Sequence, residues 1–214
     1  LDDGRWRTSR WLGNTMWFYD FPEGTMWGAT AFMMRNLIKH LRQGAPSTPP
    51  PPDIDIRTMA PSDAEHVRRV LYLAATWSPD RSAPPEGQAL EHDYFSRYHD
   101  GWGRPGDFGV VAFAGDVFLG GAYGRLFTDD DHGHGYVDTA TPEIAVGVEP
   151  DHRGNSLGGR LLRALEDVAS NMGVSQLSLS VEKENRARRL YERLGWEVLD
   201  EDDSAVRMTR RLDP

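Results

Sequence analysis

One stretch of the sequence joins an apolar strand to an amphipathic helix through a turn that contains glycine. Before the turn, Ile144, Val146 and Val148 alternate with the small residues Ala145 and Gly147, which predicts a mostly buried strand. After the turn, apolar residues recur at helical spacing: Leu157, Leu161, Leu165, Val168 and Met172. The helix therefore begins within the turn, and its free N–H groups and positive dipole end face the loop. Such a terminus attracts phosphate, so we expect the turn to bind a pyrophosphate.

Two other kinds of phosphate-binding loop share this outline, and the sequence argues against both. The Gly-x-x-x-x-Gly-Lys-[Ser/Thr] motif of ATP-binding loops does not occur. A dinucleotide fingerprint opens a first strand–helix–strand unit, whereas this loop lies late in the chain. The sequence therefore favours a phosphate-binding loop of a third kind, which is neither an ATP-binding loop nor a dinucleotide fingerprint.

The segment Arg153-Gly-Asn-Ser-Leu-Gly158 resembles the acyl-CoA signature of the GNAT superfamily of N-acetyltransferases, [Gln/Arg]-x-x-Gly-x-[Gly/Ala]. In that family, successive loop amides bind the pyrophosphate of coenzyme A. Ser156 stands where the family usually has its middle glycine; serine disfavours left-handed backbone, but it is small and its hydroxyl can donate to phosphate. A second block, Asn185-Arg-Ala-Arg-Arg-Leu-Tyr-Glu-Arg-Leu-Gly-Trp196, follows the alternating segment 176–181 and resembles the family's Asn-x-Ala-x-x-Leu-Tyr-x-x-x-Gly-Phe helix.

The resemblance implies an α/β (α+β) fold, with a mixed, mostly antiparallel sheet of about six to seven strands flanked by about four helices. It implies acetyl-CoA as co-substrate. The residues that it assigns to the cofactor are Val146, Gly147, Val148, Arg153, Gly154, Asn155, Ser156, Leu157, Gly158, Gly159, Asn185 and Tyr191. Each has a simpler interpretation when taken alone: the paired glycines could let a helix pack closely on a sheet, and the tyrosine could be a half-buried core residue.

Acyl transfer to nitrogen needs an unprotonated amine, yet an amine near pH 7 is mostly ammonium. Glu143 begins the strand before the turn, where many superfamily members carry a glutamate that deprotonates the amine, often through water. Its alternative is a solvent-exposed carboxylate at a strand end. Tyr191 matches the helix tyrosine that protonates the departing CoA thiolate. Glu143 and Tyr191 are therefore the catalytic candidates.

The function that the resemblance implies is an N-acetyltransferase, which moves an acetyl group directly from acetyl-CoA to a primary amine in a ternary complex. The acceptor is a small-molecule or peptide amine. The rival hypothesis is a catalytically silent CoA-binding module with a regulatory or interaction role, for which Ser156 and the front segment of the chain are the only hints.

Composition excludes several other classes of function. The 214 residues include no cysteine, so disulfides, cysteine nucleophiles and thiolate metal sites are ruled out, and a cytoplasmic location is expected. A formal net charge of −9 argues against nucleic acid and suits a cationic amine. The apolar runs are too short for a membrane span. The Asp- and His-rich segment 129–134 is expected to be a solvated loop with no functional metal.

The chain divides into an aromatic-rich segment, 1–44, a proline-rich linker, 45–53, and the acetyltransferase domain, 54–214. The front segment predicts a strand over 17–21 and a helix over 27–41, and its Trp-Gly-x-Thr-Ala phrase resembles the tail of CoA-directed Nudix hydrolases. It is either a remnant of an upstream domain or a segment that packs on a partner surface. That surface would belong to the acetyltransferase domain, to a second copy in a homodimer, or to a missing domain.

Within the main domain, the pattern predicts a strand at 54–59 and a helix that Ser62 caps. A second helical region is expected over 87–102, with core-like spacing of Leu90, Tyr94, Phe95 and Tyr98. Further strands are expected at 108–114 and 117–127 around a Gly115-Asp116 turn, and at 196–199 and 205–212.

Overall fold

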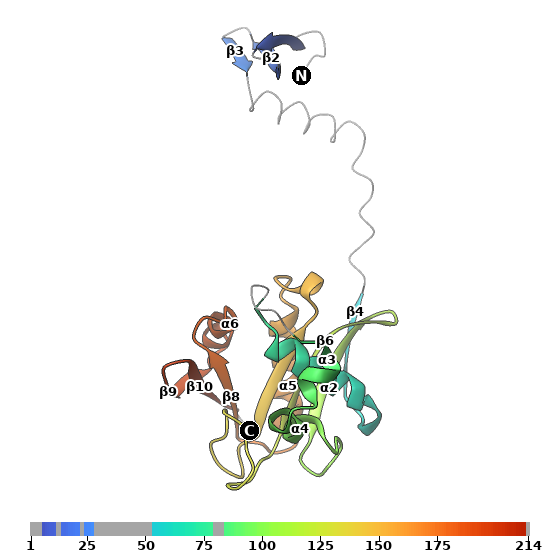
Figure 1. The fold of residues 1–214 in the computed structure, drawn as a ribbon, viewed down its shortest axis with the longest axis vertical. Helices are drawn as coiled ribbons and strands as arrows, with labels where there is room; N and C mark the ends of the chain where they lie inside the picture. Colours follow the sequence, from blue (N-terminus) through green and yellow to red (C-terminus); the bar gives the residue numbers. More distant parts are fainter. Residues whose placement is uncertain (1–5, 12–13, 22–23, 28–52, 79–83, 213–214) are drawn as a thin grey trace. The chain divides into compact units, whose positions relative to one another are not determined.

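The computed structural model describes residues 6–11, 14–21, 24–27, 53–78 and 84–212. The chain forms two compact units, one within residues 1–52 and one formed by residues 53–214 (Figure 1). In the described parts, no helix combines the length and the apolar character that a membrane crossing requires. The helix expected over 27–41 lies outside the described residues, apart from Trp27, which belongs to a strand.

The first unit contains a three-stranded antiparallel sheet of β1 (Trp6–Trp11), β2 (Asn14–Phe21) and β3 (Gly24–Trp27). The strand expected over 17–21 lies within β2, whereas its two neighbours were not predicted. Arg7 Nε donates to Asp20 Oδ2 at 2.9 Å, and the Arg7 guanidinium lies 4.6 Å from the centroid of the Phe18 ring. This contact links β1 to β2 across the sheet.

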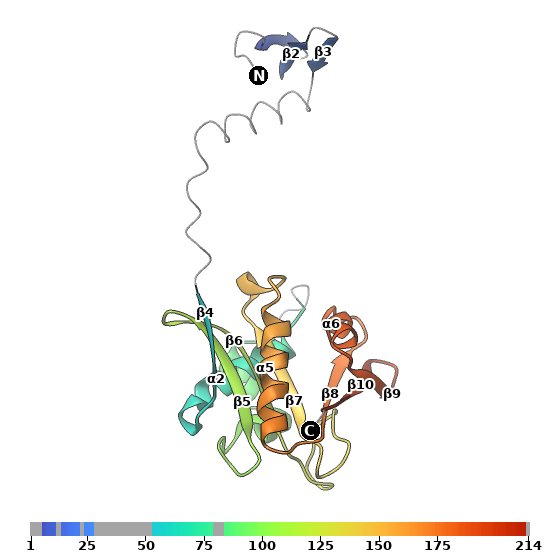
Figure 2. The same ribbon diagram turned by 180° about the vertical axis from the view of Figure 1, so that it is seen from behind.

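The second unit is built on a seven-stranded sheet with the order β4-β5-β6-β7-β8-β10-β9 (Figure 2). The strands are β4 (Ile54–Thr58), β5 (Phe108–Ala114), β6 (Val117–Arg125), β7 (Glu143–Val148), β8 (Gln176–Glu182), β9 (Glu197–Glu201) and β10 (Ala205–Arg211). All neighbours are antiparallel except β7 and β8, which are parallel. The predicted α+β fold and mixed, mostly antiparallel sheet are confirmed.

Two long helices, α2 (Ala64–Ala75) and α5 (Leu157–Asn171), cover opposite faces of this sheet (Figure 2). The alternation along β7 divides its side chains between them. Ile144 and Val146 pack in the large core cluster that contains the apolar side of α5, whereas Ala145 packs with Val67 and Val70 of α2. The strand before the turn therefore contributes to both layers of the core.

The start of α2 differs from the expectation that Ser62 caps it. Residues Pro61–Asp63 form a 3-10 turn, and α2 begins only at Ala64. Asp63 organises this turn, because its carboxylate accepts the backbone N–H of Ala60 at 2.7 Å and pairs with Arg57 at 2.8 Å. The prediction for Ser62 was wrong because a carboxylate satisfied by two partners outcompetes a hydroxyl at a helix start.

The helical region expected over 87–102 is two short helices, α3 (Glu86–Leu90) and α4 (Asp93–His99). His92 separates them with an extended backbone, and its Nδ1 accepts the backbone N–H of Tyr94 at 3.2 Å. The break therefore comes from a histidine cap, which apolar spacing does not reveal. α6 (Ala187–Arg193) lies beside β8, near where the last helix was expected.

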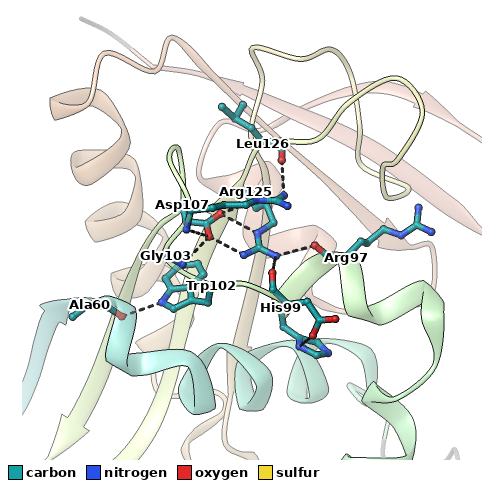
Figure 3. Close-up of polar contacts among 10 residues, drawn as sticks. Ala60, Arg97, His99, Trp102, Gly103, Asp107, Arg125 and Leu126 are labelled. Atoms are coloured by element: carbon teal, nitrogen blue, oxygen red, sulfur yellow. Dashed lines mark hydrogen bonds and ion pairs between the residues drawn. The ribbon is translucent and has the colours of Figure 1, made fainter.

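A buried ion pair joins the segment before β5 to the end of β6 (Figure 3). Arg125 Nε and Nη2 donate to the two carboxylate oxygens of Asp107 at 2.9 and 2.7 Å, and the side chains are 0% and 1% exposed. Arg125 Nη1 donates to the carbonyls of Arg97 and Asp100 at 2.9 Å each. Since Arg125 lies opposite Glu143 in the β6–β7 register, this network frames the start of β7.

Candidate functional site

β7 and β8 separate from each other along their length. They pair at one register position, Glu143 with Ser178, where the Ser178 N–H donates to the carbonyl oxygen of Pro142 at 3.0 Å. On the β6 side of β7, the Glu149 N–H donates to the carbonyl oxygen of Leu119 at 2.9 Å. In this register, the backbone groups of the odd-numbered residues of β7 form the hydrogen bonds with β6. The backbone groups of Val146 and Val148 therefore face the β8 side, beyond the point where the two strands pair. This edge of β7 can accept an extended ligand as an added strand.

The expected pyrophosphate turn lies at the carboxyl end of β7. A 3-10 turn, Pro150–His152, is followed by Gly154 and Ser156 with φ of 80° and 63°, and α5 begins at Leu157. Among the described residues, Ser156 is the one non-glycine with a positive φ. Serine therefore adopts the left-handed backbone that the family's glycine would take, in spite of its cost of about 1 kcal/mol.

Two glycines in the first turn of α5 are not required by packing. A Cβ added at Gly158 would meet Leu190 Cδ2 at 3.4 Å, and one added at Gly159 would meet Leu190 Cδ1 at 3.6 Å. Both are ordinary van der Waals distances. The close-packing interpretation therefore does not explain these glycines, whereas the approach of a ligand to the backbone does.

Gly147 has the opposite character. A Cβ at this position would lie 2.5 Å from the carbonyl oxygen of Val70 and 2.8 Å from Leu73 Cβ. Since both residues belong to α2, Gly147 lets this helix approach β7 closely. Its lack of a side chain thus has a structural reason in the fold.

Arg153 braces the turn. Its Nε donates to the carbonyl of Val148 at 2.9 Å, and its Nη1 donates to the carbonyl of Trp77 at 3.0 Å. Two of its nitrogens therefore donate to the protein. The remaining N–H groups of the guanidinium are on Nη1 and Nη2.

A neighbouring ion-pair network was not predicted from the sequence. Arg69 on α2 donates to both carboxylate oxygens of Glu149, Nε at 2.6 Å and Nη2 at 2.7 Å. Its Nη1 donates to Glu86 of α3 at 2.9 Å. Glu149 follows β7 directly, so this bidentate pair ties the start of the turn to α2 and α3. Glu86 is 17 and Glu149 is 80 positions from Arg69 in the sequence, so no local motif connects the three residues.

Glu143 lies at the other end of β7 and is 5% exposed, so the solvent-exposed alternative is wrong. Its Oε1 accepts from the Tyr98 hydroxyl and from the Gly135 N–H, each at 2.9 Å. Its Oε2 is buried and has no hydrogen-bond partner among the described residues. Burial raises the pKa of Glu143, although the two hydrogen bonds and the charges of His132 and Arg207 oppose this shift. A carboxylate with a raised pKa is a stronger base than an exposed one.

The remaining candidates lie on α6 and just before it. Tyr191 is 7% exposed, its ring centroid lies 5.9 Å from that of Trp196, and burial raises its pKa. Asn185 Oδ1 accepts the backbone N–H of Ala187 at 2.9 Å, so Asn185 supports the first turn of α6. Tyr191 packs in the same core cluster as Leu157 of α5.

Most of the aspartates and histidines of the 129–134 loop contact other residues of the protein. Asp129 accepts the Tyr136 hydroxyl at 2.6 Å, and Asp131 pairs with Arg97 at 3.1 Å. The His132 ring stacks on Tyr136 with a centroid distance of 4.4 Å. In the described part of the chain, no group of three or more of these residue types is arranged to hold a metal ion.

The Acetyltransferase (GNAT) family model matches residues 72–196, which include every candidate site residue. The chain belongs to this family of acyltransferases. Its relatives include the mycothiol acetyltransferase of Saccharopolyspora erythraea, 30% identical over 154 residues, which are 71% of this chain and 46% of the relative. The mycothiol acetyltransferase of Beutenbergia cavernae is 32% identical over 153 residues, 70% of this chain and 47% of the relative. The chain thus spans about half the length of these relatives.

Solved structures with the same fold include the PaiA N-acetyltransferase of Thermoplasma acidophilum in complex with coenzyme A. It has 18% identity and a TM-score of 0.56, over 74% of this chain and 99% of that one. YncA of Salmonella typhimurium, solved with its cofactor acetyl-CoA, has 22% identity and a TM-score of 0.55, over 76% and 95% of the two chains. The fold is therefore one that holds coenzyme A in other proteins.

Proposed function

We propose that this chain transfers an acetyl group from acetyl-CoA directly to a primary amine, with Glu143 as the base. The observation that carries the proposal is the juxtaposition along β7: an unpaired edge, a turn with two glycines that packing does not need, and a buried carboxylate at the opposite end. Membership of the acetyltransferase family supports the same reaction.

The turn supplies the cofactor contacts in this proposal. The backbone N–H groups of 154–159 and the positive end of α5 bind the pyrophosphate of acetyl-CoA. The exposed edge at Val146 and Val148 holds the pantetheine arm as an added strand, with the Val148 carbonyl fixed by Arg153. Asn155 and Leu157 contribute their backbone amides to the same turn.

The two catalytic candidates act from opposite faces of the sheet. Glu143 contacts Tyr98 of α4 and lies on the face of α2, where we place the acceptor amine. Tyr191 belongs to the cluster on the α5 face and would donate its hydroxyl proton to the CoA thiolate. Its raised pKa keeps Tyr191 protonated at neutral pH, as a proton donor must be.

Composition is consistent with direct transfer. The chain contains no cysteine, which excludes a cysteinyl acyl-enzyme, and in the proposed route the amine attacks the thioester carbon itself. Glu143 first takes a proton from the ammonium form of the acceptor, and the free amine then attacks the thioester carbon. The CoA sulfur leaves as a thiolate that Tyr191 protonates, and the second proton of the nitrogen returns to the Tyr191 oxygen through solvent.

The test is incubation with acetyl-CoA and a panel of amines without thiol groups: a polyamine, an aminoglycoside and a peptide with a free N-terminus. The absence of cysteine lets a thiol reagent report CoA release without background from the protein, and mass spectrometry identifies the product. Acetylation of at least one amine supports the proposal. Tight binding of acetyl-CoA with no acetylation of any amine would instead support the silent CoA-binding module.

The role of Tyr191 has its own test. Tyr191→Phe keeps the ring and its packing on Trp196, so we expect kcat to fall about ten- to a thousandfold while the Kd of acetyl-CoA changes little. Unchanged turnover would show that Tyr191 is a core residue without a catalytic role.

A further inference from the structure

Two tyrosine hydroxyls connect the buried carboxylate of Glu143 with the outer side of α4. The Tyr98 hydroxyl donates to Glu143 Oε1 at 2.9 Å, and the Tyr94 hydroxyl lies 3.4 Å from that of Tyr98. Tyr98 is 8% exposed, whereas Tyr94 is only half-buried. Because Tyr98 places its one hydroxyl proton on the carboxylate, Tyr94 is the donor between the two tyrosines. The hydrogen bonds therefore run in one direction, from Tyr94 inwards.

The loop that contains Gly133 and Gly135 packs directly against the Glu143 carboxylate. A Cβ at Gly133 would lie 2.6 Å from Glu143 Oε2, and a Cβ at Gly135 would lie 2.7 Å from Glu143 Cδ. The Gly135 N–H donates to Oε1, but as a backbone amide it does not pass its proton on to the carboxylate during a reaction. An acceptor amine thus has no direct contact with Glu143 from the side of this loop.

The titratable and charged groups around Glu143 come from four parts of the fold. They are Tyr94 and Tyr98 of α4, Tyr123 of β6, His132 in the loop after β6, and Arg207 of β10. Among the described side chains, Tyr98 is the one that forms a hydrogen bond with Glu143. Any hydrogen-bonded proton path from the surface to this carboxylate through side chains therefore passes through Tyr98.

We propose that Tyr94 and Tyr98 carry the proton of the acceptor amine to Glu143. The inference rests on the proposed function, in which Glu143 is the base. The ammonium proton passes to the Tyr94 oxygen as the Tyr94 proton passes to Tyr98 and the Tyr98 proton passes to Glu143 Oε1. Each tyrosine ends with one proton, Glu143 becomes neutral, and the acceptor becomes a free amine. Tyr94 is the residue that meets the acceptor, and Tyr98 is a positioning residue.

The test compares Tyr94→Phe, Tyr98→Phe and Glu143→Gln over a range of pH, with the panel amine that gives the fastest CoA release. We expect each phenylalanine variant to lose about tenfold or more in kcat/KM for the amine at a pH where the amine is protonated. The loss shrinks as pH rises, because free amine then forms without help from the protein. The Kd of acetyl-CoA stays within about twofold of the wild type, since neither hydroxyl lies at the cofactor turn.

Tyr94→Phe separates a relay from simple tuning of Glu143. In ¹³C NMR titrations of labelled glutamate carboxyls, Tyr98→Phe should raise the pKa of Glu143 because the carboxylate loses a donor. Tyr94→Phe should leave this pKa close to that of the wild type and still impair turnover. Tyr72→Phe is the matched control: Tyr72 packs in the same cluster as Tyr94 and Tyr98, but its hydroxyl donates to the Pro84 carbonyl at 3.1 Å, so its removal should leave the pH profile unchanged.

The outcomes distinguish the relay from the proposal on which it rests. Wild-type turnover in Tyr94→Phe, together with a defect in Glu143→Gln, would overturn the relay alone. In a single relay, Tyr98→Phe should reduce kcat/KM little once Glu143→Gln is present, because both residues act on the same proton path. If the double variant Tyr98→Phe/Glu143→Gln loses, relative to Glu143→Gln, the full factor that Tyr98→Phe costs in the wild type, the relay is also overturned. Full activity of Glu143→Gln would overturn both the base and the relay.

Discussion

The two ends of β7 are built in contrasting ways. The carboxyl end leads into an exposed turn in which neighbouring residues present backbone amides, with two glycines that leave room for a ligand. The amino end is a buried carboxylate held by Tyr98, which is 45 residues away in sequence, and by Gly135. A cofactor phosphate needs several adjacent amides, which a contiguous motif provides. A base that must be shielded from water needs partners from several elements.

The largest effect is expected from Arg125→Met, which tests how far the amino end depends on remote contacts. The variant removes the bidentate partner of the Asp107 carboxylate, which is 1% exposed and keeps only Arg104 at 3.7 Å as a cation, and it removes the donor to the Arg97 and Asp100 carbonyls. We expect a loss of about 3–5 kcal/mol in the free energy of unfolding, measured by urea denaturation.

Arg188→Met is the matched control for that loss. The Arg188–Glu192 pair is also bonded at 2.9 Å, but its side chains are 32% and 45% exposed. Removal of this pair should cost less than about 1 kcal/mol. Equal losses in the two variants would mean that the frame around the start of β7 has no special dependence on its buried pair.

Gly158→Glu tests the carboxyl end. The fold has room for the side chain, since a Cβ meets Leu190 Cδ2 at 3.4 Å and Val148 Cγ2 at 3.9 Å, but the charge would repel a pyrophosphate. We expect the Kd of acetyl-CoA to rise at least about a hundredfold in calorimetry, with little change in Tm. Gly87→Glu adds the same charge at a position where a Cβ meets nothing within 4 Å, and it should bind as the wild type does. Equal affinities in the two variants would separate the turn from the cofactor.

Glu143→Gln sharpens the contrast in pH dependence. Since burial raises the pKa of Glu143, the acidic limb of the wild-type kcat/KM profile should lie above the usual carboxyl range. The variant should lack that limb and lose about a hundredfold near neutral pH, with the defect shrinking as free amine accumulates at higher pH. A defect that does not vary with pH would indicate a binding role.

The smallest effect is expected from Ser156→Gly at the turn. Glycine relieves about 1 kcal/mol of left-handed strain in the folded state. It also increases the conformational entropy of the unfolded chain, which lowers the free energy of unfolding by a similar amount. The free energy of unfolding should change by less than about 1 kcal/mol, and acetyl-CoA should bind equally or a few times more tightly. A large loss of affinity would identify the Ser156 hydroxyl as a contact of the cofactor.

The same contrast explains what the sequence predicted. The turn, β7, β8 and the helix at Tyr191 depend on local spacing, and all of them lie where their motifs indicated. The partners of Glu143 and the Arg69–Glu149 pair depend on contacts between distant segments, and apolar periodicity assigned Tyr98 only to the core. The His92 cap was missed because side-chain capping competes with helical spacing in a way that periodicity does not register.

The most direct test of the account is the NMR spectrum of ¹⁵N-labelled protein titrated with acetyl-CoA, followed by amide hydrogen exchange. We predict that the amides of 154–159 and of Val146 and Val148 shift and become protected, since they would donate to pyrophosphate or face the pantetheine arm. The Gly135 amide, already bonded to Glu143, should change little. Protection confined to residues outside the turn and the exposed edge of β7, or an unchanged spectrum at saturating acetyl-CoA, would contradict the assignment of the cofactor site.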